Sequence, residues 1–140
     1  MTRDDTWLVF RAGTSQAALP IAHVVEILRP LPIEPVAGSP PMVLGLSVLR
    51  GAPVPVLAAD GLLGTDGWAA PTRFVVVRVG DRRVALAVSE VTGLRTLPAA
   101  THPLPPLVAE ALGPAVDTIR VLDAGLLLVL RDAIVVPELP

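Results

Sequence analysis

Proline most constrains what this sequence can fold into, because sixteen of its 140 residues are proline. A proline inside a helix removes one backbone hydrogen bond and clashes with the preceding turn, so long helices are disfavoured. The segments between the prolines are rich in valine, whose branched Cβ favours the pleated surface of a sheet. Together the two features predict a fold built from short β-strands.

Short apolar segments recur at regular spacing with turn residues between them, a pattern typical of an all-β barrel or sandwich. The clearest hairpin has strands at residues 73–79 and 82–88 across Gly80-Asp81, because such a dipeptide favours a tight turn. A second hairpin is expected across residues 123–125. The remaining expected strands are residues 7–11, 17–20, 42–49, 53–57 and 91–97.

Two further local features carry predictions about individual elements. The strand at residues 53–57 contains Pro53 and Pro55, which cannot donate ladder hydrogen bonds, so it is expected at a sheet edge. Residues 21–28 place apolar side chains at i, i+3, i+4 and i+7, which predicts a short helix. Residues 107–112 are also expected to form one or two helical turns.

The length predicts a single domain over residues 1–140. A glycine- and aspartate-rich stretch at residues 59–71 is expected to join two halves, residues 7–58 and 72–136. Each half has about four or five expected strands, so two small barrels with one core fit the length better than one large barrel.

Charge and composition exclude several functions. The net charge is −2 and the eleven basic residues are all arginine, spread along the sequence, which disfavours nucleic-acid binding. With no cysteine, disulfides and thiolate metal sites are excluded. The apolar segments are too short for a membrane-spanning helix, and the N-terminus lacks the apolar segment of a secretory signal.

The sequence offers few groups for catalysis. Ser47 lies in half of a nucleophile-elbow pattern without its second glycine, and is better explained as a strand residue. Asp60 and Asp66 each precede a glycine, which turn chemistry explains. His23 and His102 have no second metal ligand at helical spacing. A small hydrolase using Ser47 or the two aspartates is therefore a remote alternative, and we expect that the protein is not an enzyme.

Three segments, in order and with matching spacing, resemble the CheW-like chemotaxis coupling proteins. The strongest is residues 41–57, PMVLGLSVLRGAPVPVL, which is similar to the family's Gly-x-x-Asn-Leu-Arg-Gly-x-x-x-Pro-x-x-Asp segment. The others are residues 19–27 and the hairpin of residues 75–88, followed by Val91. The resemblance covers residues 7–130, nearly the whole chain.

This resemblance implies two intertwined five-stranded SH3-like barrels that share a hydrophobic core, with one or two short helices. It implies a cytoplasmic, non-catalytic adaptor that uses no cofactor and couples chemoreceptors to a CheA-type histidine kinase in a signalling array. The implied partners are the regulatory domain of the kinase and the cytoplasmic tip of the receptor, with no nucleic acid and no membrane insertion. Because the sequence starts at Met1 with no kinase segment, a free adaptor is expected. The partner-binding positions carried over from the family are Val24, Glu26, Gly45, Arg50 and Gly51.

Each of these positions has a plain structural alternative. Gly45 and Gly51 permit a close partner backbone or a positive φ, but also suit a turn or bulge. The guanidinium of Arg50 suits a partner carboxylate, and is equally suited to an ion pair with Glu26, which is compatible with partner binding. Val24 could instead be a core residue.

The sequence also departs from the family pattern. Val48 stands in place of the asparagine, Ala58 in place of the strand-ending aspartate, and Ser89-Glu90 in place of an Asp-Gly pair. The fold is expected to survive these changes, while the identity of the partners stays open. The main alternative function is therefore a stand-alone β-barrel scaffold that binds an unrelated protein.

Overall fold

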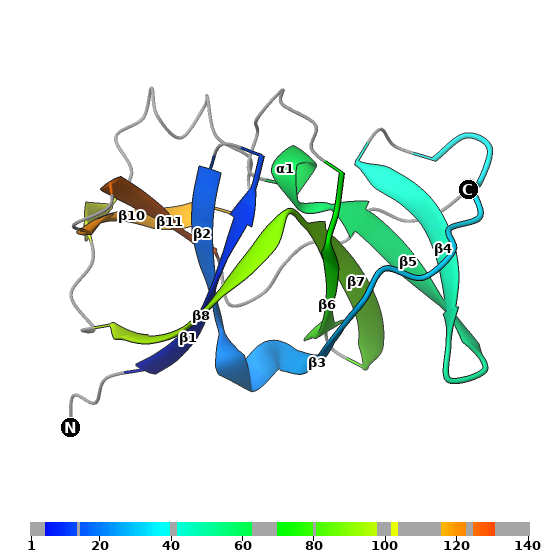
Figure 1. The fold of residues 1–140 in the computed structure, drawn as a ribbon, viewed down its shortest axis with the longest axis horizontal. Coiled ribbons are helices and arrows are strands. Elements are labelled where there is room, and N and C mark those ends of the chain that lie inside the picture. The colour runs from blue at the N-terminus through cyan, green and yellow to red at the C-terminus, as the bar shows by residue number, and fades with distance from the viewer. Residues whose placement is uncertain are drawn as a thin grey trace.

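The computed structural model of the chain describes residues 5–13, 15–39, 42–62, 70–79, 81–97, 102–103, 116–122 and 125–130. Within these ranges the protein is all-β, and its strands form two sheets that lie side by side (Figure 1). The helical segments in this part are a 3₁₀ turn, η1 (Ile21–His23), and a single turn, α1 (Ala59–Leu62). Neither is long enough to span a bilayer.

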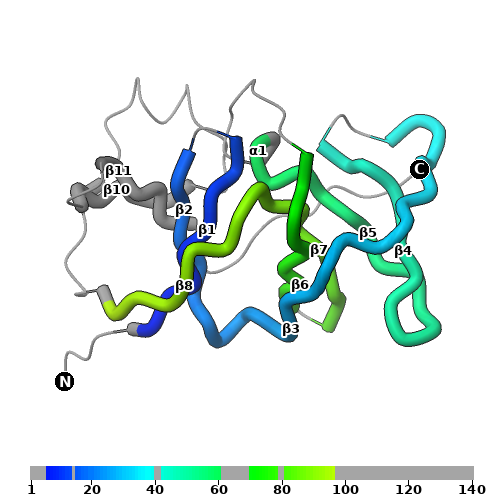
Figure 2. Tube along the Cα trace, viewed as in Figure 1, coloured from blue at the N-terminus to red at the C-terminus, as the bar shows by residue number. Residues whose placement is uncertain are grey.

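The first sheet has six strands in the order β8-β1-β2-β11-β10-β9. All neighbours pair antiparallel except β11 and β2, which are parallel. Figure 2 shows β1, at the blue end of the chain, lying along β8, in yellow-green. The strands are β1 (Asp5–Ala12), β2 (Ser15–Pro20), β8 (Glu90–Leu97), β9 (His102–Pro103), β10 (Val116–Leu122) and β11 (Gly125–Leu130).

The second sheet has five strands in the order β3-β6-β7-β5-β4. Its strands are β3 (Val24–Leu28), β4 (Val43–Leu49), β5 (Ala52–Ala58), β6 (Arg73–Val79) and β7 (Arg82–Val88). Both sheets thus take strands from before and after residues 59–71. Beyond β3 the chain crosses to the outer edge of β4, where Glu34 and Leu46 exchange two backbone hydrogen bonds of 2.8 Å. This single bridge links the two edges without closing the sheet into a continuous ladder.

Both predicted hairpins are confirmed, as β6–β7 and β10–β11. The predicted strands at residues 7–11, 17–20, 42–49, 53–57 and 91–97 are also present as β1, β2, β4, β5 and β8. Local signals suffice for these elements, because alternating or continuous apolar segments bounded by turn residues leave little other choice. The helix expected at residues 107–112 lies outside the described residues.

Two predictions about individual elements are wrong. Residues 21–28 do not form a helix: η1 ends at His23 and β3 follows it. Pairing with β6 outweighs the helical spacing, because this segment is rich in β-branched residues that suit a sheet. The β5 strand is not at an edge but between β7 and β4. Its prolines are tolerated because the pairing with β7 covers only Val56 to Ala58, after Pro53 and Pro55.

The central strands of the second sheet are buried on both faces. Along β6, Phe74 to Val77 are at most 1% exposed, which explains why this segment is a continuous apolar sequence and not an alternating one. One face contributes to a core shared with the first sheet, formed by Leu8, Phe10, Ala12, Ala17, Leu19, Val43, Leu57, Ala59, Val75, Val77, Val84, Leu86 and Val88. The other face forms an inner cluster within the second sheet, made of Val54, Val56, Phe74, Val76, Ala85 and Ala87.

The strand register brings two turns to one end of the second sheet. Because β5 and β7 are parallel, with Val56 beside Ala85, both strands start at the same end. The β4–β5 turn at Arg50 and Gly51 therefore lies at the same end as the β6–β7 turn at Asp81. We refer to this end, with residues 50–51 and 78–83, as the turn end; it holds the candidate site.

Candidate partner-binding site

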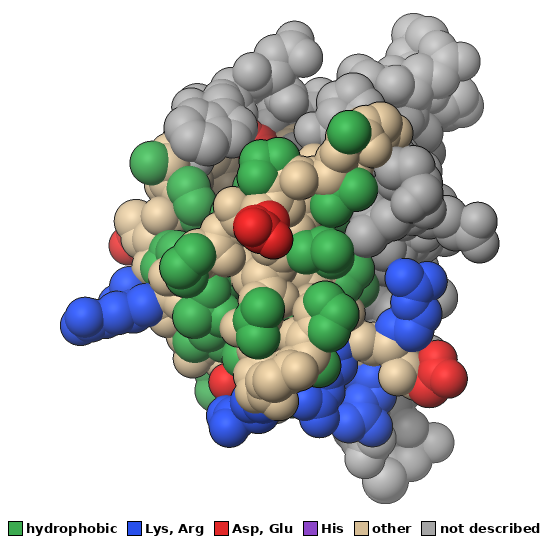
Figure 3. Space-filling view, turned by 90° about the vertical axis from the view of Figure 1, so that its right-hand side faces the viewer, with side chains coloured by type: hydrophobic (Ala, Val, Ile, Leu, Met, Phe, Trp, Pro, Cys, Tyr) green, Lys and Arg blue, Asp and Glu red, His purple; other side chains and the backbone are tan. Residues whose placement is uncertain are grey.

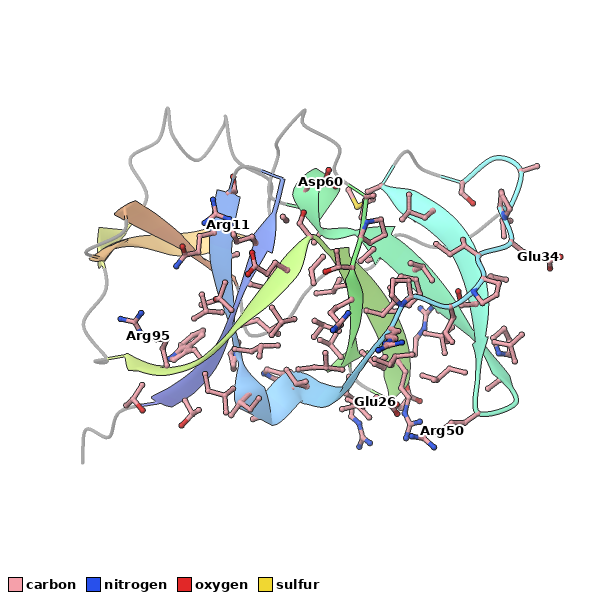
Figure 4. The ribbon with its side chains drawn as sticks, in the orientation of Figure 1. Arg11, Glu26, Glu34, Arg50, Asp60 and Arg95 are labelled. Atoms are coloured by element: carbon pink, nitrogen blue, oxygen red, sulfur yellow. The ribbon has the colours of Figure 1, made fainter. Side chains whose placement is uncertain are left out.

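Arg50 and Glu26 form a two-pronged ion pair at the turn end. The Nε of Arg50 donates to Oε2 of Glu26 at 3.0 Å, and Nη2 donates to Oε1 at 3.1 Å. Glu26 lies on β3 and Arg50 lies in the β4–β5 turn, and Figure 4 shows their side chains pointing toward one another. The ion pair that the sequence left open as an alternative for Arg50 is therefore present, and two of the predicted partner-binding residues meet.

The turn geometry keeps Arg50 exposed despite this pair. Arg50 has a φ of 50° and Gly51 a φ of 81°, as a two-residue turn with positive φ at both central positions requires. The Arg50 side chain is 68% exposed, against 24% for Glu26. Because the pair uses two of the guanidinium's five N–H donors, the group keeps donors for an external acceptor.

The pair also orients the charged group of the site. The hydrogen bond to Glu26, reinforced by the charge of that carboxylate, raises the pKa of Arg50 above its ordinary value. A guanidinium is charged at neutral pH in any case, so what the two hydrogen bonds to Glu26 add is an orientation for its planar fork. A fixed, charged fork can bind a carboxylate or a helix-end carbonyl without first losing much conformational freedom.

Gly45 lies deeper than the other predicted site residues. It is buried in β4 with a φ of 146°, and a Cβ there would lie 2.7 Å from the carbonyl carbon of Glu34 and 2.9 Å from Cγ2 of Ile33. The backbone of Glu34, in the same chain, thus makes the close approach that this glycine permits. The β4 strand has a bulge next to Gly45. Its role in partner binding stays a prediction, while its role in the fold is plain.

The other two predicted positions differ in their surroundings. Val24 is half-buried and packs against the shared core, as the structural alternative expected. Gly51 is exposed, and no heavy atom of the described chain lies within 4 Å of the place its Cβ would take. Its glycine is therefore required by the positive φ and not by crowding.

Sequence reasoning missed the exposed apolar side chains on the strands of this site. Val48 is 70% exposed on β4 and Ile27 is 42% exposed on β3, where it follows Glu26 and points to the other face of the strand. In Figure 3, hydrophobic side chains surround an acidic one in the middle of the face at the β4 side, and arginines gather along its lower edge. One sequence signal could have revealed this exposed apolar surface: position 48, on an edge strand, has a valine where the family has an asparagine. An apolar surface beside a fixed charge is typical of a protein interface.

Ser47 is a structural residue. It is 3% exposed, and its hydroxyl donates a 2.8 Å hydrogen bond to the backbone carbonyl of Pro32. The described residues include no group of three or more His, Asp or Glu side chains that could hold a metal ion. Asp66 and the side chain of His102, which the hydrolase alternative also invoked, lie outside the described residues. The Ser47 hydroxyl thus joins β4 to the segment before it and does not face a substrate.

Comparison with known proteins places this geometry in a family. The family model for the CheW-like domain matches residues 6–133. The chain belongs to the CheW-like domain family. Among curated relatives, protein FrzA of Myxococcus xanthus is 29% identical over 110 residues, covering 77% of this chain and 69% of FrzA. Chemotaxis protein CheW of Rhizobium meliloti is 32% identical over 92 residues, covering 64% of this chain and 59% of that protein.

The fold of this CheW-like domain also matches a solved structure. The crystal structure of scaffolding protein TtCheW from Thermoanaerobacter tengcongensis superimposes with a TM-score of 0.82 at 20% sequence identity. The match covers 94% of this chain and 86% of TtCheW. The family resemblance inferred from three short segments is therefore confirmed, and so is the all-β fold.

Two departures from the family pattern meet in one place of this CheW-like domain. Ala58 and Ser89 both line a hollow of about 10 Å³ beside Gly13 and Asp60, with room for about one water molecule. The Oγ of Ser89 accepts a 2.9 Å hydrogen bond from the N–H of Gly13, so it ties the β7–β8 junction to the β1–β2 turn. The two small residues therefore line the same hollow, which among the described residues has room for a water molecule but not for a substrate.

Proposed function

We propose that this protein is a non-catalytic, cytoplasmic adaptor that couples chemoreceptors to a CheA-type histidine kinase in a chemosensory array. Its partners are the regulatory domain of the kinase and the cytoplasmic tip of the receptor. The observation that carries the proposal is the membership of the CheW-like family together with the displayed Arg50–Glu26 pair. The scaffolding role named for TtCheW agrees with it.

The site supports docking in preference to chemistry. Arg50 is oriented by its two hydrogen bonds to Glu26, and exposed apolar side chains lie nearby in the sequence, Ile27 on β3 and Val48 on β4 before the turn of Arg50. An interface of this kind gains orientation from the charged fork and free energy from the apolar surface. Gly51 lets the turn present Arg50, while Val24 and Gly45 shape the strands beneath it.

We also propose that the chain is one domain over residues 1–140, formed by two intertwined SH3-like barrels with residues 59–71 between their main segments. The burial pattern supports it, since strands in each sheet are buried on both faces. In the first sheet Leu8, Val9 and Phe10 are at most 2% exposed, as are Phe74 to Val77 in the second. A sheet buried on both faces is expected when it curls around one cluster and packs its outer side against a second core.

The proposal is tested by titrating the full chain with each partner, using the kinase regulatory domain and the receptor tip from the same organism. Arg50→Glu places a carboxylate beside Glu26, so like charges meet and the fork is lost. We expect receptor-tip binding to weaken about tenfold or more. Arg73→Glu, an exposed arginine at the opposite end of β6, is the matched control and is expected to bind as wild type.

Two outcomes would count against different parts of the proposal. If neither partner binds at high micromolar concentration, the chain is a scaffold for an unrelated protein, which is the main alternative. If both bind and Arg50→Glu binds as tightly as wild type, the coupling function stands but the site is wrong. Arg73→Glu should unfold at the same temperature as wild type, because its side chain is exposed and forms no ion pair within the described part of the chain. Arg50→Glu should unfold at a slightly lower temperature, because it loses the pair with Glu26, but it should still be folded under the conditions of the titration.

A further inference from the structure

The turn end carries more positive charge than the Arg50–Glu26 pair accounts for. Arg78, Arg82 and Arg83 flank the β6–β7 turn and are all exposed, with Asp81 as the acidic residue between them. Within the described part of the chain, the one ion pair at this end joins Arg50 to Glu26. Four arginines therefore face two carboxylates here, although the chain as a whole has a net charge of −2.

The register places two of these arginines against each other. Arg78 lies directly opposite Arg83 in the antiparallel β6–β7 ladder. Side chains directly opposite one another have Cβ atoms about 4.5–5.5 Å apart, and like charges at such positions destabilise the sheet. A structural role does not explain this pair, since any neutral polar residue at either position would remove the repulsion. An anion that binds both guanidinium groups would turn the repulsion into affinity.

The same register places this pair on the face that carries Glu26. Side chains alternate along a strand, so Arg78 shares a face with Val76, and Arg83 shares one with Ala85. On the neighbouring strand, Glu26 lies opposite Val76. The three arginines at positions 50, 78 and 83 thus come from three different turns or strands to the end of the sheet where Glu26 lies.

We propose that Arg78 and Arg83 bind an acidic segment of a protein partner, with two carboxylates spaced like glutamates one helical turn apart. Residues at i and i+4 on a helix have Cβ atoms about 5–6 Å apart, which matches the expected spacing of the arginine pair. The Arg50–Glu26 pair shows the geometry that a guanidinium of this chain adopts with a carboxylate. This surface extends the proposed docking site, and it rests on the proposed function only in that the occupant is a protein.

A protein carboxylate fits better than the other polyanions. Lipid surfaces attract clusters of about four to eight basic residues, whereas here two acidic side chains, Glu26 and Asp81, lie among the four arginines. Sequence-independent nucleic-acid binding combines a basic groove with stacking aromatics. Phe74, the aromatic residue of β6, is fully buried and lies at the far end of that strand from Arg78. A small set of carboxylates at fixed spacing suits two guanidinium groups that lie opposite one another in a strand ladder.

The test uses a helical peptide with glutamates at i and i+4 on one face and an otherwise identical glutamine peptide. Each is titrated into the full chain while the Nε–Hε NMR signals of its arginines are followed at low and high salt. We expect the glutamate peptide to shift the signals of Arg78 and Arg83 but not that of Arg73, and the glutamine peptide to shift none. The double variant Arg78→Gln/Arg83→Gln should bind the glutamate peptide about three- to tenfold more weakly. Arg73→Gln, the control, should bind as wild type.

Several results would overturn the proposal. The first is equal binding of the glutamate and glutamine peptides, and the second is unchanged binding of the glutamate peptide by the double variant. The third is a shift of the arginine signals by phosphatidylglycerol vesicles but by neither peptide, which would indicate that the partner is a lipid surface. The double variant should unfold at the same or a higher temperature than wild type, because its substitutions remove a like-charge contact. Titration with the kinase domain and the receptor tip separates this proposal from the proposed function. If the chain binds the glutamate peptide but neither protein, the acidic-segment site stands and the coupling function is wrong.

Discussion

Replacing Gly45 by alanine tests whether this residue is held by the chain's own backbone. Gly45 has a φ of 146°, a conformation that side chains with a Cβ rarely adopt. The added Cβ would also meet three atoms. Two are the oxygen and carbon of the Glu34 backbone carbonyl, and the third is Cγ2 of Ile33; the carbonyl carbon would lie 2.7 Å away and Cγ2 2.9 Å away. Because two of these contacts are to backbone atoms, the segment around Glu34 must move away from β4.

The cost follows from three contributions. Holding a residue with a Cβ in such a backbone conformation costs about 1–3 kcal/mol. Overpacking against backbone atoms adds about 1–3 kcal/mol. Loss of the two hydrogen bonds between Glu34 and Leu46 adds about 1 kcal/mol each if the bridge opens. We expect Gly45→Ala to lower the free energy of unfolding by about 2–6 kcal/mol if the bridge holds and by about 4–8 kcal/mol if it opens.

Gly93 offers a matched control within the same chain. Its φ is 140°, close to that of Gly45, but no heavy atom of the described residues lies within 4 Å of the place its Cβ would take. Gly93→Ala should therefore cost only the backbone contribution, about 1–3 kcal/mol. Urea unfolding followed by circular dichroism gives both values, and the difference between the variants isolates the contact with Glu34.

Equal destabilisation by the two substitutions would refute the reasoning, because the contact with Glu34 would then contribute nothing. If Gly45→Ala does not fold in isolation, hydrogen exchange of wild type gives a second test. The Leu46 amide, which donates to Glu34, should exchange more slowly than amides at the open edge of the neighbouring sheet. A Leu46 amide that exchanges like an unprotected edge amide would contradict the bridge itself.

Three further predictions follow from the packing and charges. Ser47→Ala removes the hydrogen bond that the buried Ser47 hydroxyl donates to the carbonyl of Pro32 and should lower the free energy of unfolding by about 0.5–1.5 kcal/mol, measured by urea unfolding; an unchanged free energy of unfolding would contradict the bond. Phe74→Ala removes a fully buried ring from the inner cluster and should cost about 3–5 kcal/mol by the same assay, far more than any exposed substitution on β6. Because Glu26 raises the pKa of Arg50, the arginine's contribution to stability is fully present below the ordinary arginine pKa and is lost only as pH rises through the raised value, so it is constant around neutral pH; Glu26→Gln, which removes the carboxylate charge, should move the Nε–Hε NMR signal of Arg50 and leave that of Arg73 in place, and an unmoved Arg50 signal would contradict the pair.

Sequence patterns predicted the elements whose causes are local. The β6–β7 hairpin needs only two apolar segments and a Gly80-Asp81 turn, all within 16 residues of sequence, and its strands were placed correctly. The segment at residues 21–28 failed because the same spacing of apolar residues suits a helix or a strand. Its outcome depended on pairing with β6, which lies far along the chain.

The candidate site divides in the same way. The residues of the ion pair, Arg50 and Glu26, were identified from the sequence, because a known family pattern marks both positions. What the sequence did not reveal is that Gly45 lies beneath Glu34 and that Val48 is left exposed. Both facts depend on how the chain beyond β3 crosses to the edge of β4, and no local pattern encodes that path.

The amino-acid sequence by itself determined the strand content, the tight turns and the family, since valine, proline and turn residues act on their own neighbourhood in the chain. Only the tertiary structure decided which strands pair and which side chains share a surface. Arginines at positions 50, 78, 82 and 83 are separated in sequence by up to 33 positions, yet the parallel pairing of β5 with β7 brings their turns to one end. The register that does so is set by burying both faces of the central strands, and that free energy is gained only when distant segments meet.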